Sequence, residues 1–118
     1  MEASFKQLVV WQKAMNLVRM VYRMSKTFPP DERFALTDQL RRAVVSIPSN
    51  IAEGNGRGTS KDYAHFLNMA RGSLFEVRTQ LELAVRLGYF SVSEELSAQI
   101  DSISKMLFSM SRKLAANQ

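Results

Sequence analysis

The stretch Ser46–Ser60, SIPSNIAEGNGRGTS, combines a helical apolar pattern with a proline, a core-side asparagine, a glutamate and then three closely spaced glycines. Ile47 and Ile51 extend an apolar stripe at helical spacing, so the stretch predicts the last turns of a helix. Pro48 has no backbone N–H and its ring crowds the preceding turn, which predicts a bend there or two helical pieces. The residues before this stretch are expected to form one helical hairpin, and the residues after it another.

Apolar residues recur at helical spacing in four segments of the chain, separated by FPPDE, by the glycines, and by GYFS. Thr59 with Asp62, and Ser91 with Glu94, have the capping-box spacing that opens the third and fourth helices. The helices are expected at about 9–28, 31–54, 60–87 and 91–115. Short connections between four amphipathic helices predict an all-α, antiparallel up-down-up-down four-helix bundle, with residues 1–118 as a single domain and helix two bent at Pro48.

Details of the first two helices also follow from the pattern. The second helix is expected to begin near Asp31 or at Thr37, a residue type that favours the N-cap, and to stop at Gly54. The predicted inner face of the first helix consists of Trp11, Ala14, Met15, Val18, Val21, Tyr22 and Ser25.

The composition excludes several classes of site. The 118 residues include no cysteine, which rules out disulfides, thiolate catalysis and cysteine-based metal sites. The single histidine, His65, has no ligand-spaced neighbours, so we expect no metal and no cofactor. No apolar run approaches the roughly 18 residues of a membrane span, and the first residues lack the pattern of a secretory signal. We therefore expect a cytoplasmic protein without a membrane partner.

The charge balance favours a polyanionic partner. The formal net charge is +5, and the segment between Ala3 and Pro30 carries five basic residues and no acidic one. Such a segment attracts phosphates through its field and through counterion release. The candidate contacts with RNA or DNA are Lys13, Arg19, Arg23, Lys26, Arg41, Arg42 and Arg57. Because few aromatic residues are expected on the surface, we predict backbone contact rather than base stacking. A solvated basic flank explains the same pattern.

The polar residues around helix two favour structural roles. Asn50 is expected on the inner edge of the helix, bonded to backbone freed by Pro48 or to Ser73 and Glu76. Glu53 and Glu76 form the only carboxylate pair considered for acid–base chemistry, but we expect them to pair with arginines, and we assign no catalytic residue.

Two further features indicate contact with other chains or helices. Gly72 interrupts a long helix, where glycine costs about 1 kcal/mol relative to alanine, so a close neighbour is expected, from the bundle or from another subunit. Several apolar residues fall outside the predicted core stripes, which favours self-association. These candidate interface residues are Val45, Ala52, Leu83, Leu87 and Phe108.

With these motifs in view, the chain resembles the four-helix-bundle family named for proteins encoded in intervening sequences of bacterial 23S ribosomal RNA genes. The matching segments are LVVWQKAMNLVRMVY, FPPDERFALTDQLRRAVVSIPSNIAEGNGR, YAHFLNMARGSLFEVRTQLELA and LGYF. The resemblance extends to about Phe90, and the last helix supports the fold only. The family motif that transfers to this chain is Pro48, Asn50, Glu53, Gly54, Arg57, Gly72, Ser73 and Glu76.

This resemblance implies a homopentamer without enzymatic activity. It also implies relatedness to the accessory protein of diversity-generating retroelements, a basic pentameric barrel that binds nucleic acid and reverse transcriptase. Two hypotheses remain open on the sequence. The first is an oligomeric bundle that binds RNA or DNA phosphates, and the alternative is a protein–protein adaptor whose basic charge is incidental.

Overall fold

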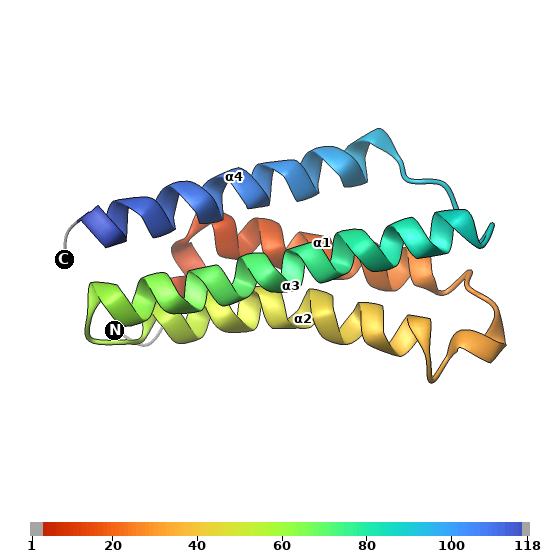
Figure 1. Cartoon of the computed structure of the whole chain (residues 1–118), viewed down its shortest axis with the longest axis horizontal. Helices are drawn as coiled ribbons and strands as arrows, with labels where there is room; N and C mark the ends of the chain where they lie inside the picture. The colour runs from red at the N-terminus through yellow and green to blue at the C-terminus, as the bar shows by residue number, and fades with distance from the viewer. Residues whose placement is uncertain (1–3, 117–118) are drawn as a thin grey trace.

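Four long helices form an antiparallel up-down-up-down bundle in the computed structural model, which describes residues 4–116 (Figure 1). The bundle measures 46 × 23 × 20 Å, and α1 begins at the same end where α4 finishes. Each helix packs against its two neighbours around the bundle, and the predicted all-α fold class is confirmed. The elements are η1 Ser4–Gln7, α1 Val9–Ser25, η2 Pro30–Glu32, α2 Leu36–Asn55, α3 Ser60–Arg86 and α4 Glu94–Ala116. None of the described helices is long and apolar enough to cross a membrane.

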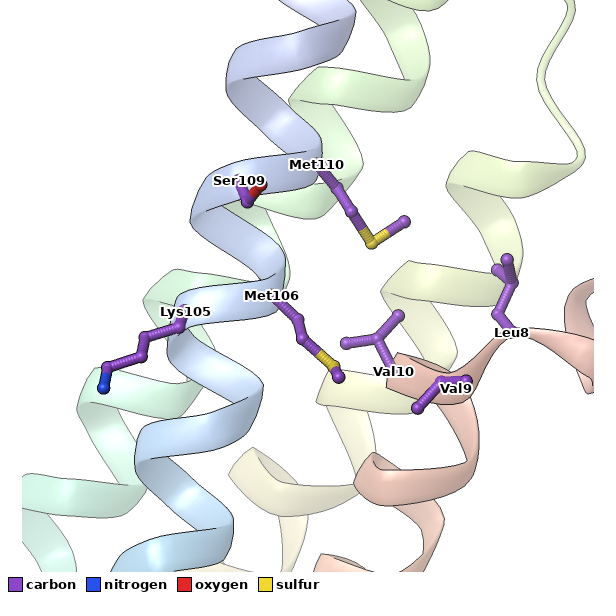
Figure 2. Close-up of a pocket in the computed structure, with 7 residues that line it drawn as sticks. All are labelled: Leu8, Val9, Val10, Lys105, Met106, Ser109 and Met110. Carbon is purple, nitrogen blue, oxygen red and sulfur yellow. The ribbon is translucent and has the colours of Figure 1, made fainter.

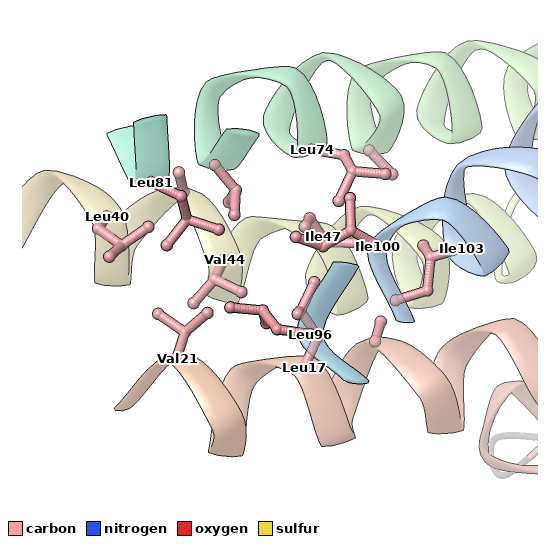
Figure 3. Packing of buried hydrophobic residues seen from close by; sticks show 14 of the residues in the cluster. Leu17, Val21, Leu40, Val44, Ile47, Leu74, Leu81, Leu96, Ile100 and Ile103 are labelled. Carbon is pink, nitrogen blue, oxygen red and sulfur yellow. The ribbon is translucent and has the colours of Figure 1, made fainter. Parts of the chain in front are cut away.

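The core runs along the axis between the four apolar stripes (Figure 3). Each helix contributes branched aliphatic side chains that are fully or almost fully buried, and burial of each one favours the folded chain by about 1.5–3 kcal/mol. The labelled core residues are Leu17, Val21, Leu40, Val44, Ile47, Leu74, Leu81, Leu96, Ile100 and Ile103.

The inner face of α1 differs from the predicted one. Val10 and Leu17 are buried, whereas Met15 and Tyr22, which were expected inside, are exposed. The guanidinium of Arg41 in α2 covers the exposed Tyr22, with its carbon 4.6 Å from the ring centre. The exposed flank with Met15 and Tyr22 is apolar as well, so the apolar stripe of α1 is wider than the part of the helix that the core covers.

The ends of two helices also differ from expectation. The first helix stops at Ser25, three residues early, and Phe28 then turns inward to join the core. The second begins at Leu36 rather than at Asp31, because Pro30–Glu32 forms a separate 3-10 turn. Its N-cap is Ala35, not Thr37, and the Leu36 N–H is bonded to the Glu32 carboxylate instead.

Of the two predicted helix caps on α3 and α4, the structure confirms the first and contradicts the second. Thr59 caps α3 as expected, and its hydroxyl accepts a hydrogen bond from the Asp62 N–H at 3.1 Å. The predicted cap Ser91 lies outside α4, and Ser93 takes its place by accepting from the Leu96 N–H at 3.1 Å.

The Ser46–Ser60 stretch holds α2 against α3. The helix continues through Pro48 as one piece to Asn55, so the alternative of two pieces is wrong, while the bend itself stays a prediction. Gly54 is not the helix stop but a site of close approach, because an added Cβ there would lie 2.8 Å from Cβ of Phe66. Absence of a side chain lets the two helices meet at their connecting loop.

The opposite end of the bundle is tied by a hydrogen bond between two turns. Tyr89 Oη, in the turn after α3, donates to Glu32 Oε2 at 2.6 Å. The Phe28 ring lies 5.6 Å from the Tyr89 ring and 5.9 Å from the Phe90 ring. This contact joins the α1–α2 turn to the α3–α4 turn.

Candidate nucleic-acid interface

A basic stripe lies on the side of α1 opposite the core and consists of two arginines of the helix and its C-cap residue, Lys26. Arg19, Arg23 and Lys26 are spaced at i, i+4 and i+7, which places them on one side of a helix. All three are exposed, and within residues 4–116 none is in an ion pair with a carboxylate. Lys13 is half-buried on the same helix. We call Arg19, Arg23 and Lys26 the α1 basic stripe.

A hollow of about 270 Å³ lies beside this stripe, between α1 and α4. Two amide side chains, Asn16 and Gln99, line it together with Arg19 and Arg23. Amide and guanidinium groups both donate hydrogen bonds, so the hollow suits an anion. Glu95 also lines the hollow and opposes an anion there.

Arg41 extends the positive charge to the end of α1. Its Nε donates to Ser25 Oγ at 2.9 Å, and its Nη2 donates to the carbonyl of Tyr22 at 3.3 Å. A cation at the C-terminal end of a helix is favoured by the helix dipole. Arg41 therefore also serves as a structural link between α1 and α2.

The other two predicted arginines lie apart from the stripe and carry partners. Arg42 Nε lies 2.9 Å from Asp38 Oδ2, and Arg57 Nη2 lies 3.0 Å from Glu53 Oε1. Arg57 also covers the Phe66 ring, with its guanidinium carbon 4.7 Å from the ring centre. The segment of α2 between Arg41 and Asn55 spans about 21 Å, so Arg57 lies at the other end of the bundle. The seven predicted contacts thus do not form one continuous patch.

The polar family motif is used differently from the prediction. Asn50 Nδ2 donates to the Ser46 carbonyl of its own helix at 2.9 Å rather than to a group on α3, so the predicted link through Asn50 is wrong. Instead, the hydroxyls of Ser46 and Ser73 are hydrogen-bonded between α2 and α3. Glu53 likewise pairs along its own helix, with Arg57.

The carboxylates considered for acid–base chemistry do not come together. Glu53 lies at the level of Gly54, which meets Phe66, while Glu76 lies ten residues further along α3. Ten helical residues span about 15 Å. Both carboxylates are exposed. Glu53 pairs with an arginine as expected, but the same expectation for Glu76 is wrong, because Glu76 is in no ion pair among the described residues. Within that part of the chain, no three histidine or carboxylate side chains are grouped so as to hold a metal ion.

The candidate interface residues occupy three separate places. Val45 and Ala52 follow Arg41 at helical spacing, so they lie on the flank of α2 that borders α1. Leu83 and Leu87 lie on the outer side of α3, in line with Gly72, around which an added Cβ would meet nothing within 4 Å. Thus no helix of the same bundle is the close neighbour of Gly72. The fifth residue, Phe108, lies at the junction of α3 and α4.

An apolar groove was not foreseen from the sequence. It lies between the start of α1 and the second half of α4 and encloses about 370 Å³ (Figure 2). Val9 at its edge is 59% exposed. The apolar pair Val9-Val10 was a weak signal, because Val10 is buried while its neighbour Val9, about 100° further around the helix, is exposed. The lining residues are Leu8, Val9, Val10, Lys105, Met106, Ser109 and Met110.

Residues 6–109 match the protein family described as "23S rRNA-intervening sequence protein". The chain belongs to this family. A crystal structure from Bacteroides thetaiotaomicron, described as a protein with unknown function from the S23 ribosomal protein family, has the same fold with a TM-score of 0.79. The two chains are 23% identical, and the match covers 95% of this chain and 99% of the other. No curated protein matches the sequence. Membership in the 23S rRNA-intervening sequence protein family confirms the resemblance and specifies no activity.

Proposed function

We propose that this protein is a non-enzymatic, oligomeric helical bundle that binds the phosphate backbone of RNA or DNA through the α1 basic stripe. The observation that carries the proposal is that Arg19, Arg23 and Lys26 are exposed in line on α1 and unpaired with any carboxylate in residues 4–116. Phosphates that contact these cations release condensed counterions, which favours binding without a requirement for sequence. The family resemblance also implies relatedness to the retroelement accessory protein, and this expectation favours the same class of ligand.

The oligomeric part of the proposal is supported by two apolar stripes on different helices, in which Val45, Leu83 and Leu87 are exposed and Ala52 is half-buried. One stripe, Val45 and Ala52, borders α1, and the other, Leu83 and Leu87, is continuous with the open site at Gly72. When two different surfaces of successive copies meet, the contact is heterologous and can close into a ring. The resemblance implies five copies in that ring. A monomer mass in light scattering at micromolar concentration would contradict this part.

The binding part is tested with two charge-matched variants. In the first, Arg19, Arg23 and Lys26 of the α1 basic stripe are replaced by glutamine. In the second, the same charge is removed from exposed residues on other elements, with Arg33, Lys61 and Arg86 replaced by glutamine. Binding to mixed-sequence RNA and to duplex DNA is measured by fluorescence anisotropy at one salt concentration.

We expect the stripe variant to bind roughly tenfold more weakly or worse, because three phosphate contacts are removed, and the control variant to bind nearly as well as the wild type. Equal weakening in both variants would show that binding follows net charge alone and would overturn the assignment to α1. Absence of binding by the wild-type protein would overturn nucleic-acid binding altogether.

A second candidate function, that of a protein–protein adaptor, is favoured by the apolar groove between α1 and α4. Exposed apolar grooves bind amphipathic helices, and methionines such as Met106 and Met110 adapt to different partners. A partner retained from nuclease-treated extract by the wild type and released by Val9→Asp would favour the adaptor. The same partner retained by Val9→Asp would exclude the groove as its binding site.

A further inference from the structure

The junction of α3 and α4 exposes two phenylalanine rings among arginines. Phe75 on α3 is 52% exposed and Phe108 on α4 is 45% exposed. The guanidinium carbon of Arg71 lies 4.8 Å from the Phe108 ring centre and 5.9 Å from that of Phe75. Arg112 lies 5.6 Å from the Phe108 ring centre. Aromatic and cationic groups therefore alternate along this seam.

The spacing of the two rings follows from the register of the helices. Arg71 meets Phe108, and Arg78 Nη2 bonds to Asp101 Oδ1 at 2.9 Å, so residues seven apart on α3 pair with residues seven apart on α4. In this register Phe75 is level with a residue four positions before Phe108. The two rings are thus separated by one helical turn, about 6 Å along the bundle axis.

Of the two α3 arginines at this seam, one is paired with a carboxylate and the other is not. Asp101 holds Arg78, whereas Arg71 is in no ion pair among residues 4–116, and its Nε is buried without a hydrogen-bond partner. The Arg71 guanidinium therefore lies within cation–π distance of both rings and has no carboxylate partner in residues 4–116. Its charge remains available to an anion placed over the seam.

A shallow hollow of about 420 Å³ borders Phe108 on the outer surface of α4. It is lined by Phe108 together with Arg112 and Lys113, and no acidic residue of the described chain lines it. A ligand that fits this surface needs a flat π face for the rings and negative charges at intervals for the arginines. Single-stranded nucleic acid has both, whereas the base faces of a duplex are covered by their neighbours in the stack.

We propose that the α3–α4 seam binds single-stranded RNA or DNA, with bases stacked on Phe75 and Phe108 and phosphates in contact with Arg71, Arg112 and Lys113. The ligand class rests on the proposed function, but the site and its preference for single strands do not depend on the α1 basic stripe. The inference replaces our expectation of backbone contact alone, because the aromatic residues are more exposed than the sequence pattern indicated.

The test compares a labelled single-stranded oligonucleotide of about 12 nucleotides with the duplex of the same sequence. Two variants are measured by fluorescence anisotropy, Phe75→Ala with Phe108→Ala, and the control Phe34→Ala. Phe34 is a matched control because it is 84% exposed and has Arg33 5.1 Å from its ring centre, but lies in the α1–α2 connection. A third variant with leucine at 75 and 108 keeps apolar bulk and removes only the π faces.

We expect the alanine and leucine double variants both to bind the single strand roughly tenfold more weakly or worse, since base stacking is abolished, and to bind the duplex as the wild type does. Phe34→Ala should bind both ligands normally. Unchanged single-strand binding, or equal weakening for single strand and duplex, would overturn the inference. A changed assembly mass in light scattering would also overturn it, because the rings would then be a subunit contact.

Failure of the proposed function is distinguishable from failure of this inference. If the glutamine variant of the α1 basic stripe binds both ligands normally while the phenylalanine variants no longer bind the single strand, the stripe is wrong and the seam is right. If the stripe variant binds neither ligand and the phenylalanine variants bind both, the seam is wrong and the stripe is right.

Discussion

Gly54 and Phe66 meet at the loop end of the α2–α3 pair, so closely that a Cβ on Gly54 would lie 2.8 Å from the Phe66 Cβ. The same added Cβ would lie 3.0 Å from Cδ1 of Tyr63 and 3.3 Å from the Tyr63 carbonyl oxygen. Backbone and Cβ atoms cannot move aside without a shift of a whole helix. The main role of the segment 49–54, SNIAEG, is therefore to let α2 approach α3 closely at Gly54.

Gly54→Ala should lower the free energy of unfolding by about 1–3 kcal/mol, the usual cost of forcing an extra carbon into a packed interface. Urea unfolding followed by circular dichroism measures the change. Gly58→Ala is the control, because a Cβ at Gly58 would meet nothing within 4 Å. Equal stabilities of wild type and Gly54→Ala would contradict the close approach.

Gly72→Ala is expected to have the opposite effect on the isolated chain. A Cβ at Gly72 has open space around it, so alanine should raise the free energy of unfolding by about 0.5–1 kcal/mol through its better helix propensity. If the outer side of α3 is a subunit contact, the same substitution should weaken self-association, which analytical ultracentrifugation measures. A more stable chain with unchanged assembly would remove Gly72 from the interface.

Tyr89 should make stability depend on alkaline pH. Its hydrogen bond to Glu32 raises the pKa of Tyr89 above its ordinary value of 10.0. Because the pKa is higher in the folded state, the hydrogen bond contributes fully to the free energy of unfolding below about pH 10. This contribution disappears as the pH rises through the folded-state pKa. We expect the stability advantage of wild type over Tyr89→Phe, measured by urea unfolding, to be constant near neutral pH and to vanish at high pH. A difference that is independent of pH would contradict this.

Glu95→Gln should strengthen nucleic-acid binding at the α1 basic stripe. Glu95 lines the same hollow as Arg19 and Arg23, so removal of its charge should raise affinity roughly two- to fivefold, the range of an exposed charge pair. Glu94→Gln, an exposed neighbour on the same helix, makes the same change in net charge and is the control. Equal increases in affinity in the two variants would indicate a general charge effect.

Much of the fold was predictable because each helix carries its own periodic signal. The four helices, the Thr59 cap and the buried stripe of α2 all depend on residues close together in the sequence. The inner face of α1 was not predictable in the same way, since its apolar stripe extends from Val10 to Tyr22 around more of the helix than the core covers. Which part faces inward depends on packing against the other helices, which the spacing within α1 does not encode.

In the candidate sites, too, features within one helix were predictable, whereas contacts between helices were not. The exposed cations of α1 follow from spacing within one helix, and so do the ion pairs of Arg42 with Asp38 and of Arg57 with Glu53, at i and i+4. The proximity of Arg71 to Phe108 could not be predicted, because it depends on the register of α3 against α4. Asn50 was misplaced because a bond to its own helix competes with bonds to α3.

The measurement that tests the central claim most directly is the salt dependence of duplex binding by the wild-type protein and by the glutamine variant of the α1 basic stripe. For three phosphate contacts we predict that the wild-type association constant falls roughly 40-fold between about 50 and 200 mM salt. The logarithm of the association constant should fall less steeply with the logarithm of the salt concentration in the variant, with a slope smaller by about one for each cation replaced. Identical slopes for the two proteins, or a wild-type affinity that is independent of salt, would contradict phosphate binding by the α1 basic stripe.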